Sequence, residues 1–255
     1  MDSNHDGLSE WMSGPHSGMD TQRERMGLWG ARISEGVDIN AYLVREMRAY
    51  AILANLRGRP EAARKYEKLA DQLRDRMRAR MWDEKDGWYY DVNLKTGRPI
   101  RVKSVASFAV LWAGIATPEQ AKRMIYEHLL NAREFWTNYP VPGLARTEPG
   151  YSEQPLAGDV GGMWRANTWV PTNYQLYHAL RNYGYGQIAS VLGYDTERMV
   201  RNAGSCEVYG AESGKCMGLH PFWGWSMLGY FFGFEDRLNV QLQNVGFSPP
   251  SPVRR

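Results

Sequence analysis

The strongest constraint on the fold is a pair of long helical patterns in the first third of the chain. In residues 37–56 apolar side chains recur at a helical period, namely Ile39, Leu43, Met47, Tyr50 and Ala54. Residues 61–82 repeat this pattern, and their other face is crowded with Lys and Arg, as on a solvated surface. Gly58 and Pro60 stand between the two patterns, where a glycine ends one helix and a proline opens the next. The sequence therefore predicts an antiparallel helical hairpin.

Further helices are predicted along the rest of the chain. They cover residues 105–116, 118–130, 170–183, 186–202 and 222–234. Thr117 and Gln120 form a capping-box pattern around Pro118, which marks a helix start. The chain thus contains about seven helices, mostly in antiparallel hairpins with long loops after alternate helices. This pattern is typical of an all-α protein of the α/α toroid type, and seven helices predict an incomplete toroid of the (α/α)6 kind.

The segments between these helices differ in character. Residues 82–101 place turn signals around an aromatic, strand-like run, which predicts an irregular hairpin. Residues 131–168 form a long segment rich in Gly, Pro and aromatics, and such loops usually carry function. Residues 204–220 are predicted as loop. We expect residues 1–235 to form one catalytic-type region and residues 236–255 an extended arm and tail.

Composition excludes several classes of protein. The net charge of +3 comes from scattered basic residues, which gives no nucleic-acid footprint. No run of 18 apolar residues predicts a membrane span, and no secretory signal opens the chain, which favours a cytoplasmic location unless the chain begins mid-protein. Residues 2–7 read D-S-N-H-D-G, half of a calcium-loop pattern. Ser13 stands where a bidentate Glu should follow, so an Asx-type turn is preferred and no metal or cofactor is expected.

The two cysteines, Cys206 and Cys216, do not make a disulfide framework. A bridge between them is one interpretation, and two buried free thiols are the preferred one.

Two carboxylates are the candidate reactive groups. Asp20 follows the small-residue turn of Ser17 and Gly18, within the stretch G-P-H-S-G-M-D-T-Q-R-E-R. Glu207 is the first glutamate of C-E-V-Y-G-A-E-S-G and precedes the aromatic run F-W-G-W-S. The chain holds 10 Trp and 15 Tyr, which suit a ligand that is apolar on one face and hydroxylated at its edge, such as a sugar. We therefore expect the two carboxylates to face each other across a sugar-binding pocket.

Other side chains compete for these roles. Glu212 and Asp159 are rival carboxylates for the base. His16, His178 and His220 are expected to be hydrogen-bonded structural residues.

An ordered series of motifs resembles one enzyme family. The motifs are S-G-M-D (17–20), V-D-I-N-A (37–41), W-D-E-K-D-G-W-Y-Y-D (82–91), L-W-A-G-I-A (111–116), G-G-M-W-R-A-N-T-W-V-P-T-N-Y (161–174), E-V-Y-G-A-E-S-G (207–214) and F-W-G-W-S (222–226). The series is similar to the catalytic domain of glycoside hydrolase family 63, nearest to its mannosylglycerate and glucosylglycerate hydrolases, with trehalases as distant relatives. It covers residues 2 to about 234.

The resemblance implies an (α/α)6 barrel and hydrolysis of a small α-glucoside or α-mannoside with inversion. It implies that Asp20 is the general acid and Glu207 the general base. An inverting mechanism needs one protonated carboxyl and one ionised carboxylate about 6.5–9.5 Å apart, so that a water fits between them. The expected substrate-binding residues are Trp11, Arg23, Trp164, Arg165, Trp169, Asn173, Tyr209, Trp223 and Trp225.

The chain also departs from the family pattern. His16 replaces a Glu, Ala211 replaces the proline of the base motif, and the arginine expected after Asp20 is out of register. The helices that should precede the acid motif are absent, which predicts either a missing N-terminal half or self-association through an exposed apolar wall. Two alternatives stay open: a non-catalytic sugar-binding or assembly protein left by truncation of the barrel, and a helical interaction scaffold.

Overall fold

The computed structural model describes residues 1–27, 32–154 and 163–238, and the helical hairpin dominates one side of it. Helix α3 (Val37–Leu56) packs along α4 (Pro60–Arg80), with Gly58 in the left-handed region between them. The predicted hairpin is confirmed. The most deeply buried face of α3 differs from the predicted apolar face of Ile39, Leu43, Met47, Tyr50 and Ala54. Ala41 and Val44 are completely buried, whereas Tyr50 is exposed.

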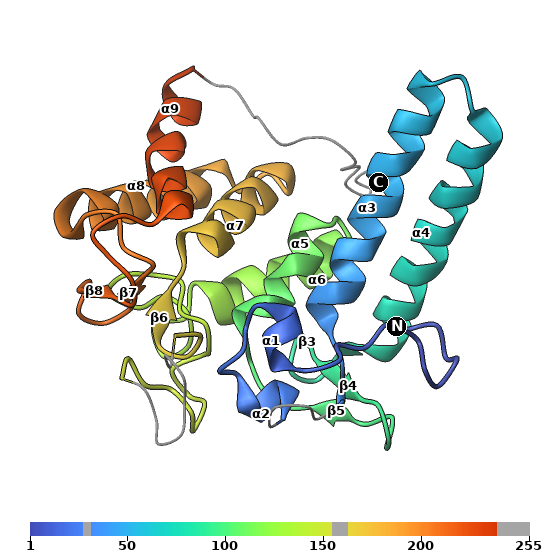
Figure 1. Ribbon diagram of the computed structural model, residues 1–255, viewed down its shortest axis with the longest axis horizontal. Coiled ribbons are helices and arrows are strands. Elements are labelled where there is room, and N and C mark those ends of the chain that lie inside the picture. The colour runs from blue at the N-terminus through green and yellow to red at the C-terminus, as the bar shows by residue number, and fades with distance from the viewer. Residues whose placement is uncertain (28–31, 155–162, 239–255) are drawn as a thin grey trace.

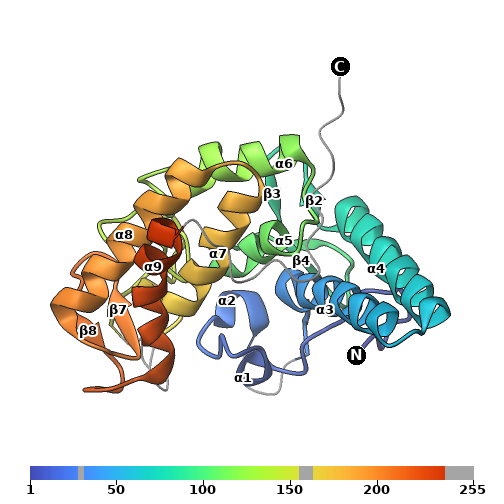
Figure 2. The same ribbon diagram turned by 90° about the horizontal axis from the view of Figure 1, so that it is seen from above.

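The remaining helices continue in an arc (Figures 1 and 2). The short helix η1 (Val105–Phe108) leads into α5 (Ala109–Trp112), and α6 (Pro118–Arg123) continues as a π-helical turn, η2 (Met124–Leu129). They are followed by α7 (Val170–Asn182), α8 (Gly186–Ala203), η3 (Gly224–Tyr230) and α9 (Phe231–Leu238).

Contacts between the helices define two layers. Helix α5 contacts both α3 and α7, and α7 contacts η3, which gives one continuous layer. Helix α4 packs on α3 and α8 packs on α7, outside that layer. Paired inner and outer helices are the architecture of an α/α toroid, and the described helices form part of one. The predicted fold class is thereby confirmed.

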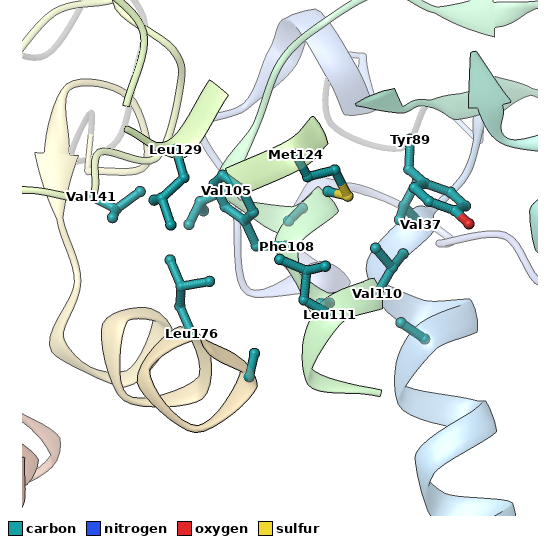
Figure 3. Close-up of a cluster of buried hydrophobic side chains, with 14 of the residues drawn as sticks. Val37, Tyr89, Val105, Phe108, Val110, Leu111, Met124, Leu129, Val141 and Leu176 are labelled. Carbon is teal, nitrogen blue, oxygen red and sulfur yellow. The ribbon is translucent and has the colours of Figure 1, made fainter. Parts of the chain in front are cut away.

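The core lies where η1 and α5 are enclosed by the helices on either side. Val110 and Leu111 of α5 are completely buried and share one cluster with Val37 of α3 and Leu176 of α7 (Figure 3). The almost wholly apolar sequence of this segment is thus explained by burial on every side. The start of α6 is the predicted capping box, since Thr117 Oγ1 accepts from the Gln120 backbone N–H and Gln120 Oε1 accepts from the Thr117 N–H.

Short β-strands in the segments between the helices pair into small sheets. The predicted irregular hairpin contains β2 (Trp82–Asp83) paired with β3 (Trp88–Tyr89), and β4 (Asp91–Asn93) paired with β5 (Pro99–Ile100). Strand β4 also pairs with β1 (Ser34–Glu35), which gives the order β1-β4-β5.

A second three-stranded sheet overturns the prediction that residues 204–220 are only loop. Strands β7 (Val208–Gly210) and β8 (Cys216–Met217) form a hairpin, and β7 also pairs with β6 (Asn167–Thr168), in the order β6-β7-β8. The strands are too short for an alternating pattern to show in the sequence.

This hairpin also corrects the prediction of free thiols. Cys206 and Cys216 form a disulfide, with their Cα atoms 5.5 Å apart. The reason is the reversal of the chain at the β7–β8 turn, which places Cys216 opposite Tyr209, three residues after Cys206.

The N-terminal loop is the predicted Asx-type turn. The carboxylate of Asp2 accepts hydrogen bonds from the backbone N–H groups of Asp6 and Gly7, and that of Asp6 accepts from Leu8. Within the described ranges, no three His, Cys, Asp or Glu side chains converge as they would around a metal ion. Among the described helices, none combines the length and the hydropathy that a membrane crossing requires.

Candidate functional site

The segment that carries Asp20 links two single-turn helices, α1 (Gly14–Ser17) and α2 (Arg23–Met26). The hydroxyl of Ser17 donates to the Gly14 carbonyl at 2.6 Å and accepts from the Met19 N–H at 3.0 Å. Gly18 ends α1 with φ of 74°, a backbone conformation that favours glycine. The turn leaves Asp20 half-buried. Figures 1 and 2 show α1 and α2, the helices on either side of it.

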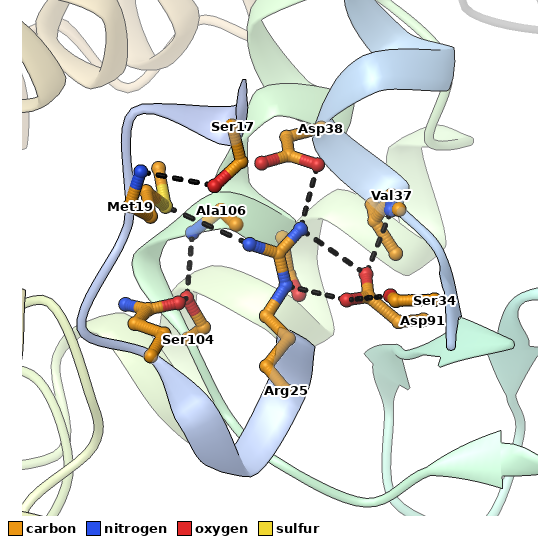
Figure 4. Close-up of polar contacts among 12 residues, drawn as sticks. Ser17, Met19, Arg25, Ser34, Val37, Asp38, Asp91, Ser104 and Ala106 are labelled. Atoms are coloured by element: carbon orange, nitrogen blue, oxygen red, sulfur yellow. Dashed lines mark hydrogen bonds and ion pairs between the residues drawn. The ribbon is translucent and has the colours of Figure 1, made fainter. Parts of the chain in front are cut away.

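A buried ion cluster fixes this segment to the helical body (Figure 4). The Arg25 guanidinium lies 2.6 Å from Asp38 Oδ1 on α3 and 2.5 Å from Asp91 Oδ2 on β4. Asp91 also accepts from the hydroxyl of Ser34 and the N–H of Val37. All three charged side chains are almost fully buried, so Arg25 has a structural role.

The residues directly after Asp20 contact the long loop of residues 131–168. Thr21 Oγ1 accepts from the Trp164 N–H at 3.0 Å. Gln22 Nε2 donates to the carbonyls of Gly143 and Trp164, each at 2.9 Å. The loop is therefore held against the Asp20 turn by its backbone.

Glu207 approaches the same loop from the β7–β8 hairpin. Its backbone N–H donates to the Leu219 carbonyl at 2.9 Å, and its Oε2 accepts from the Leu219 N–H at 2.9 Å. A Cβ on Gly218 would lie 2.6 Å from Glu207 Oε2 and 2.1 Å from Met163 Cε. Glu207 and Met163 therefore both lie close to Gly218. Met163 is followed by Trp164, whose backbone N–H donates to Thr21, the residue after Asp20. The two-residue segment of Met163 and Trp164 thus connects the surroundings of the two carboxylates.

Four of the expected stacking residues form one connected row of indoles. Trp164 and Trp169 stack with ring centroids 4.0 Å apart and planes 6° apart. Trp225 meets the edge of Trp169 at 5.6 Å and contacts Trp223 at 5.3 Å. Trp169 is buried and Trp225 is 43% exposed. The row therefore runs from the core beside the Asp20 segment to the surface near the hairpin of Glu207.

Three other expected ligand contacts use their polar atoms within the protein. Asn173 is fully buried and donates to the Pro140 carbonyl and to Thr196 Oγ1. The Tyr209 hydroxyl is bound to backbone groups of Gly204 and Cys206. Arg165 is 2% exposed and donates to the Gly150 carbonyl. These contacts hold loops around the site, and a direct contact with substrate stays a prediction for all three.

The remaining expected residues lie at the Asp20 segment. Trp11 is half-buried and its indole N–H donates to Asp38 Oδ1 at 2.9 Å. Arg23 is half-buried and begins α2. Their contact with a ligand also stays a prediction.

Burial shifts the pKa of Asp20 in the direction that a general acid needs. Removal of the carboxyl from solvent raises the pKa of Asp20, and a hydrogen bond from its own backbone N–H opposes this rise. A raised pKa keeps more of the side chain protonated at neutral pH, ready to donate a proton.

The rival carboxylate Glu212 is engaged elsewhere. It lies in the β7–β8 turn, where Arg146 Nε donates to its Oε1 at 2.7 Å and the Tyr151 hydroxyl donates to the same oxygen at 2.6 Å. The hydrogen bond from Arg146 lowers the pKa of Glu212, and Tyr151 lowers it further. The other rival, Asp159, lies outside the described residues.

Glu212→Gln is expected to leave the hydrolytic rate within about twofold of the parent and to cost about 1 kcal/mol of stability, because the ion pair is partly exposed. The pKa of Glu212 is lower in the folded than in the unfolded protein, so the carboxylate stabilises the parent fully at pH values above the unfolded-state pKa. This contribution is lost as the pH falls through the folded-state pKa, so the difference in stability between parent and variant should disappear there. Urea titrations at neutral and acidic pH measure it. Loss of activity comparable with that of Glu207→Gln would assign the base to Glu212 instead.

The three histidines occupy structural positions. His16 Nδ1 lies 2.7 Å from the Ser13 hydroxyl, and His220 Nδ1 lies 3.2 Å from the Gly218 carbonyl. His178 is fully buried beside Tyr174, and burial lowers its pKa to about 4. Its Nε2 lies 3.5 Å from Glu235 Oε1 and neither ring nitrogen makes a hydrogen bond to the described residues, so the expectation of a hydrogen-bonded histidine is wrong at this position.

Sequence reasoning missed several residues that shape the site. Asp38 and Asp91 enter the sequence analysis only as members of motifs. An aspartate within an apolar pattern is itself a signal that the carboxylate is buried in an ion pair, here with Arg25. Glu153 Oε1 accepts from the backbone N–H groups of Glu212 and Ser213 and so anchors the hairpin turn. No local signal could have identified Glu153, because its partners lie about 60 residues away.

A cavity of about 440 Å³ lies elsewhere, between α8 and α9. It is lined by Ser190, Tyr194, Glu197, Arg198, Arg201, Asn202, Gly233, Asp236 and Arg237. Neither candidate carboxylate lines this cavity, and none of the four indoles does.

The fold and the sequence together define the class of protein: the chain has the fold and the sequence of a glycoside hydrolase family. It belongs to the family of the mannosylglycerate hydrolase MGH1-like glycoside hydrolase domain, whose profile matches residues 5–226. This membership confirms the resemblance that the ordered motifs indicated.

Characterised relatives are similar over part of their length. Mannosylglycerate hydrolase from Thermus thermophilus is 30% identical over 149 residues, which are 57% of this chain and 33% of that protein. Cytosolic neutral trehalase from Kluyveromyces lactis is 32% identical over 143 residues, which are 55% of this chain and 18% of that protein. A crystal structure of a GH63 mannosylglycerate hydrolase from T. thermophilus in complex with Tris aligns with a TM-score of 0.68 at 26% identity, covering 79% of this chain and 45% of that one. The chain thus spans less than half the length of each of these relatives.

Proposed function

We propose that this region hydrolyses a small α-glucoside or α-mannoside with inversion of the anomeric centre. Asp20 is the general acid and Glu207 the general base. The observation that carries this proposal is that neighbours of both carboxylates, Thr21 beside Asp20 and Gly218 beside Glu207, lie against the Met163 and Trp164 segment next to the indole row. The raised pKa of Asp20 supports its role as the acid.

The roles follow from what each group can do. Protonated Asp20 supplies the proton to the leaving oxygen, and ionised Glu207 removes a proton from the attacking water. The exposed face of Trp225 offers a stacking surface for a sugar ring, whose axial C–H groups pack on an indole. Mannosylglycerate hydrolase structures with glucose and with D-glycerate among the relatives favour a glycosylglycerate-type substrate.

The test of the mechanism is the anomer of the first product. Incubation with α-linked disaccharides and α-glycosylglycerates, followed by ¹H NMR from the first minute, should show the β-anomer of the released sugar before mutarotation. Initial release of the α-anomer would exclude an inverting pathway. An authentic inverting and an authentic retaining α-glucosidase run in parallel serve as controls.

A second candidate, a non-catalytic sugar-binding or assembly protein, is favoured by the exposed apolar side chains of the C-terminal region. Phe222, Trp225, Phe231 and Phe234 are between 43% and 67% exposed. A large exposed apolar surface typically contacts another protein or a ligand. A saturable change in tryptophan fluorescence with sugars, without turnover of any of them, would select this candidate.

A further inference from the structure

The orientation of the Glu207 carboxylate depends on one short return segment. Leu219 donates its backbone N–H to Glu207 Oε2, and the Leu219 carbonyl accepts from the Glu207 N–H. This pair of contacts lies beyond the end of the β7–β8 ladder, whose last cross-strand pair is Val208 with Met217. The position of the base is therefore set by where residues 216–219 lie.

The ladder alone is a weak support for this segment. Strand β8 is a two-residue edge strand with two cross-strand pairs to β7. Strand β7 is held on its other side by β6, whereas β8 depends on these two pairs with β7, and so short a pairing adds little stability. Gly218, with φ of 70°, adds a further constraint, because it must admit Glu207 Oε2 at a distance that a Cβ would not allow.

The disulfide supplies the missing support. Cys206 directly precedes Glu207 and is buried, and its backbone is bound by the hydroxyls of Tyr209 and Ser226. Cys216 begins the return segment and is half-buried. The bond between them therefore joins the anchored side of Glu207 to the segment that orients its carboxylate.

We propose that the Cys206–Cys216 disulfide is a positioning element for the base, and that its reduction slows turnover. The inference rests on the proposed role of Glu207. Reduction by a dithiol adds two electrons and two protons to the S–S bond, which gives two cysteine thiols, while the dithiol becomes a disulfide. Residues 216–219 are then held to the Glu207 strand by hydrogen bonds without a covalent link, and the Leu219 N–H fixes the carboxylate less firmly.

The first test compares oxidised and dithiothreitol-reduced protein at constant pH. Reduction should lower kcat about tenfold or more and leave KM within about twofold, because a displaced base acts on the attacking water and not on sugar binding. Reoxidation should restore kcat. The Cys206→Ser/Cys216→Ser protein should have the low kcat with and without dithiothreitol.

Two further variants separate positioning from general loosening of the hairpin. Gly218→Ala keeps the disulfide, yet its methyl group would lie 2.6 Å from Glu207 Oε2 and 2.1 Å from Met163 Cε, so it should reproduce the fall in kcat. Arg146→Lys weakens the ion pair at the turn, at the other end of the hairpin, and should keep the parental kcat and the parental response to dithiothreitol.

Hydrogen exchange gives a readout that needs no turnover. Reduction should accelerate exchange of the amide protons of Glu207 and Leu219 more than those of α7, as measured by mass spectrometry on peptides from these segments. Unchanged exchange at both amides, or unchanged kcat on reduction, would overturn the inference. If Glu207→Gln abolishes activity while reduction does not change it, this inference fails and the proposed function stands. Full activity of Glu207→Gln would remove the proposed function itself.

Discussion

Replacement of Glu207 by glutamine is expected to lower kcat about 10²–10⁴-fold, because the amide cannot accept a proton from the attacking water. The loss should be the same for an aryl α-glycoside and for an unactivated disaccharide, since both need the water. Asp20→Asn should lose a similar factor on the disaccharide and much less on the aryl glycoside, whose leaving group departs without a proton. Initial rates on both substrates measure this difference.

Parental activity of both variants would refute the assignment. The pH profile adds a check on Asp20. Burial raises its folded-state pKa, so the acid remains protonated to higher pH than an exposed aspartate does, and kcat/KM should fall as pH rises through that value. The Asn variant should lack this basic limb, and a limb that persists in Asp20→Asn would belong to another group.

Arg25→Met is expected to have the largest effect on stability, a loss of about 3–5 kcal/mol near neutral pH. The substitution leaves Asp38 and Asp91 as uncompensated buried carboxylates within one cluster. Burial already raises the pKa of Asp91 even with Arg25 present. Without the guanidinium this pKa should rise further, so the difference from the parent should shrink as pH falls and the carboxyls become protonated. Urea titrations at several pH values measure the loss.

Arg101→Met is the matched control for Arg25→Met. Arg101 also pairs with two aspartates, Asp83 and Asp86, yet its side chain is 54% exposed. Its loss should cost less than about 1 kcal/mol because water replaces the pair. Equal losses in the two variants would show that the buried cluster is not what fixes the Asp20 segment.

The predictions that the structure confirms depend on short-range patterns. The hairpin of α3 and α4 follows from apolar periodicity with a glycine and a proline between, and the start of α6 follows from Thr117 and Gln120. Each signal is formed by residues that are near one another along the chain, so no distant contact is needed to recognise it. The positions of Asp20 and Glu207 were instead identified by an ordered series of motifs, and their catalytic roles remain proposals.

The amino-acid sequence by itself determined the long helices, the capping box of α6 and the two carboxylates proposed for the site. Only the tertiary structure decided which residues contact each other across the chain. It pairs Arg25 with Asp91, 66 residues away, forms the disulfide across the β7–β8 hairpin, and brings the indoles from Trp164 to Trp223 into one row. The physical reason is that a helix is specified by neighbours along the chain, whereas a buried charge or a cross-strand bridge is specified by whichever segment the packing brings against it.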